Sequence, residues 1–169
     1  MEIYLAHPGE NDGQDLTEQG VWQMENLARR LKIENIKFDR IYANGHNVSR
    51  QAAWILGSSA GSPIIHDERF VELNKTFIEG SFSEPEFENL GYINLFVDEV
   101  VGRGENALVI LGDGMHRAIM SRLTGLPLVS TRHFSLSPAS LSVLKYYGAG
   151  STGFWRLNVV NDVNHLRVP

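Results

Sequence analysis

The sequence has 169 residues, 43% of them hydrophobic and 21% charged, which is typical of a globular protein the size of one α/β domain. With 15 Lys and Arg against 20 Asp and Glu, the formal net charge of -5 argues against a broad basic surface for nucleic acid. The absence of cysteine excludes disulfide bonds, a thiolate nucleophile and a Cys-ligated zinc ion. We therefore expect one domain over residues 1–169, with no nucleic acid as partner.

The beginning of the chain and its apolar runs show no targeting or membrane signal. Residues 1–5 have no basic leader followed by the apolar stretch of a secretory signal. No apolar run approaches the roughly 20 residues that cross a bilayer. We expect a cytoplasmic protein without a membrane as partner.

Short apolar runs alternate with helical periodicity in the first half of the chain. A buried strand is predicted over Ile3–Ala6, and a helix follows it with Thr17 as N-cap. The apolar face of this helix consists of Val21, Met24, Leu27, Ala28 and Leu31. A second strand over Phe38–Ala43 precedes a helix that contains Ala52, Ala53, Ile55 and Leu56.

The second half continues the alternation. A capping box over Ser83–Glu86 begins a helix with an apolar stripe made of Phe87, Leu90, Phe96, Val97 and Val100. A strand over Ala107–Leu111 turns into a helix over Met115–Leu123, and strands over Ser140–Tyr146 and Gly153–Val160 follow. This order predicts a three-layer α/β/α sandwich with a mostly parallel central sheet. Ligands bind such sheets at the carboxyl ends of strands, here near His7–Asp12 and Gly112–Met115.

Two segments near these strand ends carry motifs. Tyr4–Glu10 ends in His-Pro-Gly-Glu, and Val48–Ala53 reads Val-Ser-Arg-Gln-Ala-Ala. Further motifs follow along the chain: Leu16–Gly20, Phe38–Tyr42, Asp67-x-Arg69, Glu79-Gly80, Gly104–Asn106, Arg117-Ala118, Leu123–Pro127, Ser140–Leu144 and Asn161-Asp162. In this order they resemble the histidine phosphatase superfamily, also called phosphoglycerate mutase-like. The resemblance covers nearly the whole chain and implies the phosphoglycerate mutase-like fold.

The family's chemistry uses a histidine nucleophile, flanking arginines and a second histidine that stabilise phosphoryl charge, and a carboxylate general acid. By resemblance, the first arginine position is His7 and the nucleophile position is Pro8. The second arginine position is Val48, and the second histidine position is Gly112. Only Glu72, at the carboxylate position, keeps the residue type that the family's chemistry needs.

These replacements predict a catalytically degenerate homologue. Proline has no side-chain lone pair and no backbone N–H, so Pro8 can neither attack nor hold phosphate. Each lost guanidinium removes about 4 kcal/mol of attraction for a charge 4 Å away at an effective dielectric of 20. We expect a pseudoenzyme with a binding or regulatory role. Its predicted ligand pocket is lined by His7, Pro8, Gly9, Val48, Gly112, Asp113 and His116.

Two other hypotheses stay open at the level of sequence, and they leave the question of enzymatic activity open. In one, His7 attacks phosphorus and Arg50, His46 or His116 supplies positive charge. In the other, a metal or small ligand binds a cluster made of His7, Glu72, Asp113 and His116. We expect no cofactor and no dedicated metal motif. A small molecule, or a second copy in a homodimer as is frequent in the family, is the expected partner.

Simpler interpretations also apply to single residues. His7 can be a packed histidine, Glu72 a solvated carboxylate, and Asp113 an ordinary turn residue between glycines. Arg50 and Arg117 are expected on the surface or in salt bridges between helices. The tryptophans are expected at core or half-core positions, namely Trp22, Trp54 and Trp155.

Overall fold

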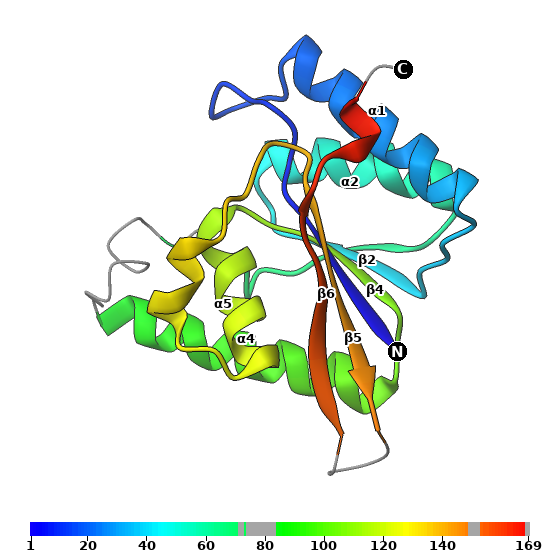
Figure 1. Cartoon of the computed structure of the whole chain (residues 1–169). Coiled ribbons are helices and arrows are strands. Elements are labelled where there is room, and N and C mark those ends of the chain that lie inside the picture. The colour runs from blue at the N-terminus through cyan, green and yellow to red at the C-terminus, as the bar shows by residue number, and fades with distance from the viewer. Residues whose placement is uncertain (71–72, 74–83, 149–152, 168–169) are drawn as a thin grey trace.

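The protein is described by a computed structural model that covers residues 1–70, 73, 84–148 and 153–167, without the side chains of 84–89. Strands and helices alternate through the first four-fifths of the chain, and two strands follow (Figure 1). The elements are β1 Glu2–Ala6, α1 Glu18–Ile33, β2 Arg40–Ala43, α2 Asn47–Ala60, β3 Ile64–His66, α4 Glu84–Arg103, β4 Ala107–Ile110, α5 Asp113–Thr124, the 3-10 helix η1 Leu128–His133, β5 Leu141–Tyr147, β6 Phe154–Asp162 and the 3-10 helix η3 Asn164–Leu166.

The six strands form one sheet in the order β3-β2-β4-β1-β5-β6. The first four strands of this order run parallel, whereas β5 is antiparallel to β1 and β6 is antiparallel to β5. Figure 1 shows α1 and α2 on one face of the sheet and α4 and α5 on the other. The predicted three-layer sandwich with a mostly parallel sheet is therefore confirmed.

Both faces of the sheet are buried. Along β1, Ile3 and Leu5 pack in the core under α4 and α5, while Tyr4 and Ala6 pack in the core under α1 and α2. This alternation follows from the period of two residues in a strand. All four residues of β4 are completely buried, which explains why this central strand reads as a continuous apolar run.

Helix α1 begins as predicted. The Thr17 hydroxyl accepts a hydrogen bond from the Gly20 N–H at 3.0 Å, so Thr17 is the N-cap. Four of the five residues of the predicted apolar face are buried, namely Met24, Leu27, Ala28 and Leu31. The prediction is wrong for Val21, which is 36% exposed because it lines an open cavity between α1 and α2.

Other details differ from the sequence prediction. Strand β3 was not expected, because three residues after Pro63 are too few to show a period. Trp54 was expected in the core or half-core, yet it is 68% exposed because the buried stripe of α2 runs through Ala52, Ala53 and Leu56 instead. The predicted capping box over residues 83–86 lies mostly outside the described side chains.

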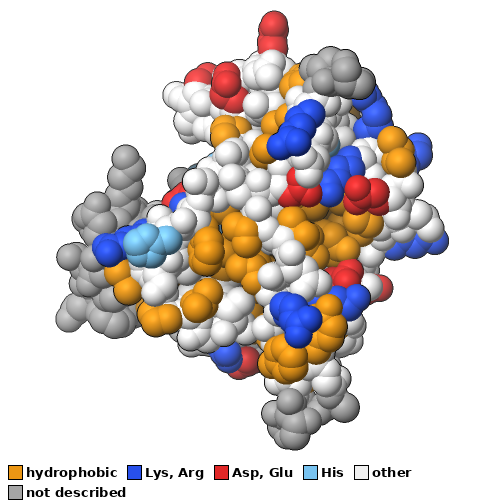
Figure 2. Space-filling view, viewed as in Figure 1, with side chains coloured by type: hydrophobic (Ala, Val, Ile, Leu, Met, Phe, Trp, Pro, Cys, Tyr) orange, Lys and Arg blue, Asp and Glu red, His pale blue; other side chains and the backbone are white. Residues whose placement is uncertain are grey.

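The surface is mixed in charge on the face that Figure 2 shows. Acidic and basic side chains lie among one another there, and hydrophobic side chains gather over the β5–β6 side of the sheet. Half-buried Trp155, Leu157 and Val160 of β6 pack against the core on this side. None of the described helices is both long and apolar enough to cross a membrane.

Candidate functional site

A cavity of about 260 Å³ lies at the carboxyl edge of the parallel strands. It is lined by His7, Pro8, Asn11, Gly13, His46, Val48, Ser49, Gly112 and Asp113. Strands β1 and β4 are parallel neighbours, with Ala6 opposite Ile110, so the loops that follow them meet. The start of α2 adds the third wall. The structure thus brings together five of the predicted pocket residues, and this edge is where open α/β sheets bind ligands.

The β1 exit is held by hydrogen bonds that fix the ring of His7. The His7 N–H donates to the Ser140 carbonyl at 2.9 Å, and the Pro8 carbonyl accepts from the Ala139 N–H at 2.9 Å. The same Pro8 carbonyl accepts from His7 Nδ1 at 3.0 Å. Because a carbonyl oxygen only accepts, Nδ1 is the donor in this bond, and Nε2 makes no hydrogen bond with the described residues. The pyrrolidine ring of Pro8 itself is buried.

The α2 wall presents Val48 to the cavity, and not the neighbouring cation Arg50. His46 is the N-cap of α2 without a side-chain cap bond, and its N–H donates to Asn44 Oδ1 at 3.2 Å. Val48 packs partly against the core between α1 and α2. Arg50 is exposed, as predicted, but it lines a different cavity. It therefore does not supply charge to the first cavity.

The β4 exit holds an acidic group whose charge is already compensated. Both oxygens of Asp113 accept from Arg117 one turn later, at 2.8 Å and 3.0 Å. Arg117 also donates to the carbonyls of Thr131 and Phe134, which ties η1 to α5. The expectation of a surface or interhelical salt bridge was wrong for Arg117. It is 8% exposed, and its ion pair lies within α5.

His116 lies behind this wall and does not line the cavity. Its side chain is fully buried, and neither ring nitrogen has a hydrogen-bond partner among the described residues. Burial, with smaller effects from the neighbouring charges of His7 and Arg117, lowers the pKa of His116 to about 3. The ring is therefore neutral at neutral pH, and it cannot stabilise the charge of a phosphoryl group.

Two predicted site residues have other places. Gly9 is buried against α1, where a Cβ would overlap the Gly20 carbonyl, so this position needs glycine for a close backbone approach. Glu72 lies outside the described residues, and so its expected role as the retained carboxylate stays a prediction. Its neighbour Leu73 is buried and contacts the start of α5 at Gly114.

Sequence patterns did not identify Asn11, Gly13 and Ser49 as lining residues. The position of Asn11 and Gly13 in the loop after β1 was the available signal, because such loops border the ligand edge of a parallel sheet. The lining contains no Lys or Arg among the residues that the structure describes. Within the same residues, no three His, Asp or Glu side chains gather as metal ligands.

The sequence model of the histidine phosphatase superfamily (branch 1) matches residues 7–90. No curated protein matches the sequence. Three solved structures are described next, and each is at most 19% identical to this chain. Their similarity shows a shared fold.

The Bacillus stearothermophilus protein YhfR is 19% identical and has a TM-score of 0.79 over 98% of this chain and 99% of its own. A mycobacterial glucosyl-3-phosphoglycerate phosphatase is 17% identical, with a TM-score of 0.75 over 95% and 98%. The α-ribazole phosphatase of Shigella flexneri is 17% identical, with a TM-score of 0.74 over 96% and 97%. Residues 7–90 thus match the histidine phosphatase superfamily, and the chain as a whole has the fold of these phosphatases.

Proposed function

We propose that this chain is a histidine phosphatase homologue that does not hydrolyse phosphate monoesters and that binds a small ligand in its remodelled cavity. The observation that carries the proposal is the lining at the strand ends. Pro8, Val48 and Gly112 face one cavity, and each stands where the resemblance expects a catalytic side chain. A regulatory role follows most directly from a pocket that binds without turning over.

The missing nucleophile is the first reason. Phosphoryl transfer to the enzyme needs a lone pair in line with phosphorus. The ring of Pro8 has none, and its carbonyl already accepts two hydrogen bonds. This position therefore provides a rigid exit from β1, which orients His7 but performs no attack.

Electrostatics is the second reason. A phosphate dianion needs cations around its equatorial oxygens, each worth about 4 kcal/mol at 4 Å and an effective dielectric of 20. Arg117 is bound to Asp113 and two carbonyls, and burial keeps His116 neutral. The described lining instead offers neutral polar groups such as those of Asn11 and Ser49. This favours an uncharged polar ligand over phosphate.

The test is turnover of p-nitrophenyl phosphate and of sugar phosphates by the purified chain. We expect no activity above that of the Glu72→Ala variant, which lacks the one retained catalytic residue type. This comparison separates activity of the chain from that of a contaminant, because a contaminant does not depend on Glu72. Turnover that the Glu72→Ala variant abolishes would overturn the proposal.

A second function is favoured by one specific observation. The hydrogen bond from His7 Nδ1 to the Pro8 carbonyl leaves Nε2 as the free nitrogen of a half-buried histidine in the cavity. This is the arrangement that a phosphoryl acceptor needs. Of the three side chains considered as sources of positive charge for this mechanism, only His46 lines the same cavity, and it is exposed.

Phosphorylation of His7 is tested by ³¹P NMR after incubation with acetyl phosphate. The binding proposal predicts no phosphohistidine signal. A signal that is present in the unchanged chain and in the His133→Gln control, but absent from the His7→Gln variant, would decide for the displaced nucleophile. His133 is exposed on η1, and it does not line the cavity.

A further inference from the structure

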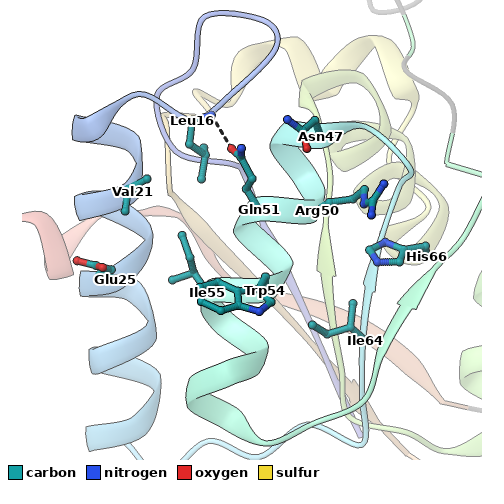
Figure 3. Close-up of a pocket in the computed structure, with 10 residues that line it drawn as sticks. All are labelled: Leu16, Val21, Glu25, Asn47, Arg50, Gln51, Trp54, Ile55, Ile64 and His66. Carbon is teal, nitrogen blue, oxygen red and sulfur yellow. Dashed lines mark hydrogen bonds between the residues drawn. The ribbon is translucent and has the colours of Figure 1, made fainter.

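A larger cavity lies between α1, α2 and the edge strand β3. Its volume is about 480 Å³, and it shares no lining residue with the cavity at the strand ends. Figure 3 shows its lining, which consists of Leu16, Val21, Glu25, Asn47, Arg50, Gln51, Trp54, Ile55, Ile64 and His66. The volume lies in the range of small-molecule sites, roughly 300–1,000 Å³.

The body of this cavity is apolar. Trp54 stands in the middle of the lining with Ile55 beside it and Ile64 below (Figure 3). Trp54 is 68% exposed although it is the largest apolar side chain type. A smaller adjoining cavity extends past Trp54 towards Arg29 and Lys32, so the indole borders two open spaces. An exposed aromatic surface in a concave site marks a place for an apolar ligand group.

One end of the cavity carries positive charge. In Figure 3 the guanidinium of Arg50 points towards the ring of His66, while Glu25 lies on the opposite side, on α1. Arg50 makes no ion pair or side-chain hydrogen bond with the described residues. Its neighbours Asn47 and Gln51 both donate to Oδ1 of Asp15, and Asp15 does not line the cavity. An exposed guanidinium with five donors is thus left for a ligand.

We propose that this cavity binds a small aromatic carboxylate. The carboxylate accepts the paired N–H groups of Arg50, whose planar fork matches its geometry, beside His66. The aromatic ring lies against Trp54 and the aliphatic side chains of Ile55 and Ile64. Glu25 at the other side disfavours a second negative charge, which selects monoanions over dicarboxylates.

The proposal is independent of activity at the strand ends. Along the start of α2, His46 and Val48 face the first cavity, and Asn47 and Arg50 face the second. A ligand at Arg50 therefore leaves the first lining free. Failure of one proposal leaves the other standing.

The test is isothermal titration calorimetry of the whole chain with 1-naphthylacetate, compared with the neutral amide 1-naphthylacetamide. We expect saturable binding of the carboxylate with a Kd below about 1 mM. The Arg50→Gln substitution weakens binding of the carboxylate at least about tenfold, but leaves binding of the amide unchanged. The affinity of the Arg50→Lys variant for the carboxylate lies between those of the unchanged chain and Arg50→Gln, because lysine keeps the charge and loses the planar fork.

Two more variants complete the design. Trp54→Ala weakens binding of both compounds, since the ring contact is common to them. Arg132→Gln is the matched control, because Arg132 is an exposed arginine on η1, in the other helix layer. We expect this variant to bind both compounds with unchanged affinity. In ¹⁵N NMR, the amide signals of residues 47–55 and 64–66 shift on binding, while those of 7 and 113 do not.

Three results would overturn the proposal. They are absence of saturable binding, equal loss of affinity in Arg132→Gln and Arg50→Gln, and amide shifts confined to residues 7 and 113. All substituted side chains are exposed, so an unchanged melting temperature verifies that each variant is folded.

Discussion

The two cavities beside the start of α2 differ in whether their charged side chains are paired. At the strand ends, Asp113 is held by Arg117, and the guanidinium is used to join α5 to η1. Between α1 and α2, Arg50 makes no ion pair with the described residues. Among the described residues, the cavity at the strand ends therefore has no Lys or Arg in its lining, whereas the cavity between α1 and α2 contains the unpaired guanidinium of Arg50.

The loop between β1 and α1 borders both cavities. A substitution that disturbs the contact between this loop and α1 therefore affects both cavities. Asn11 and Gly13 line the first cavity, and Leu16 lines the second. The anchor is Gly20, where a Cβ would overlap the Glu10 carbonyl. We expect Gly20→Ala to lower the free energy of unfolding by at least about 3 kcal/mol, measured by urea denaturation, although alanine favours helices.

The control is Gly45→Ala, in the loop before α2. A Cβ at Gly45 meets nothing within 4 Å, and its φ is not positive. We expect this variant to stay within about 0.5 kcal/mol of the unchanged chain. Equal stability of the two variants would show that the close contact between the loop and α1 does not anchor the cavities.

Substitutions of Arg117 and Arg50 test this difference, because Arg117 is buried and paired whereas Arg50 is exposed and makes no ion pair with the described residues. Arg117→Met leaves the Thr131 and Phe134 carbonyls and Asp113 without their donor. We expect a loss of about 2 to 3 kcal/mol, at the lower end for a buried pair because the Asp113 side chain is 41% exposed. Arg50→Met changes stability by less than about 0.5 kcal/mol. A similar loss of unfolding free energy in Arg117→Met and Arg50→Met would contradict the distinction between a structural arginine and an unpaired one.

Sequence patterns predicted the layers, the N-cap at Thr17 and the meeting of the β1 and β4 loops. These features depend on local propensity and on the geometry of parallel sheets, and both are visible in a single chain. The patterns did not predict the pair of Asp113 with Arg117, although a spacing of four residues on a helix allows it. Whether such a pair forms depends on what surrounds it, here the carbonyls that η1 presents.

The exposure of Trp54 was missed for a related reason. The pattern places an aromatic residue among apolar neighbours on α2, but burial depends on whether another element covers that face. Trp54 and Val21 both line the open cavity between α1 and α2, and both are exposed. Tertiary spacing of this kind has no signature in residue periodicity.

Burial of His116, behind the first cavity, makes stability depend on pH. The pKa of His116 is lowered from 6.5 to about 3, mainly by burial. Below pH 6.5 the unfolded chain binds a proton there that the native chain does not, so this contribution to stability is present above pH 6.5 and is lost as pH falls. Between pH 7 and 5 the loss is at most about 2 kcal/mol.

The check is the free energy of unfolding at pH 7 and pH 5 for His116→Leu and His66→Leu. The first variant flattens the dependence on pH by up to about 2 kcal/mol, since a leucine binds no proton. His66→Leu is the control, because it removes an exposed histidine outside the first cavity. Other titrating groups contribute equally to all three proteins. An unchanged slope in His116→Leu would mean that the pKa of this ring is the same in the native and the unfolded chain.

The smallest expected effect concerns what the second cavity contributes to folding. Trp54 is 68% exposed, so Trp54→Ala removes little buried surface and lowers the free energy of unfolding by less than about 1 kcal/mol. On the same helix, Leu56 is 1% exposed, and Leu56→Ala lowers it by about 3 kcal/mol. A large loss in Trp54→Ala would assign the indole to packing between α1 and α2. A small loss, together with weaker binding of 1-naphthylacetate, leaves ligand binding as the role of an aromatic side chain that the fold does not need.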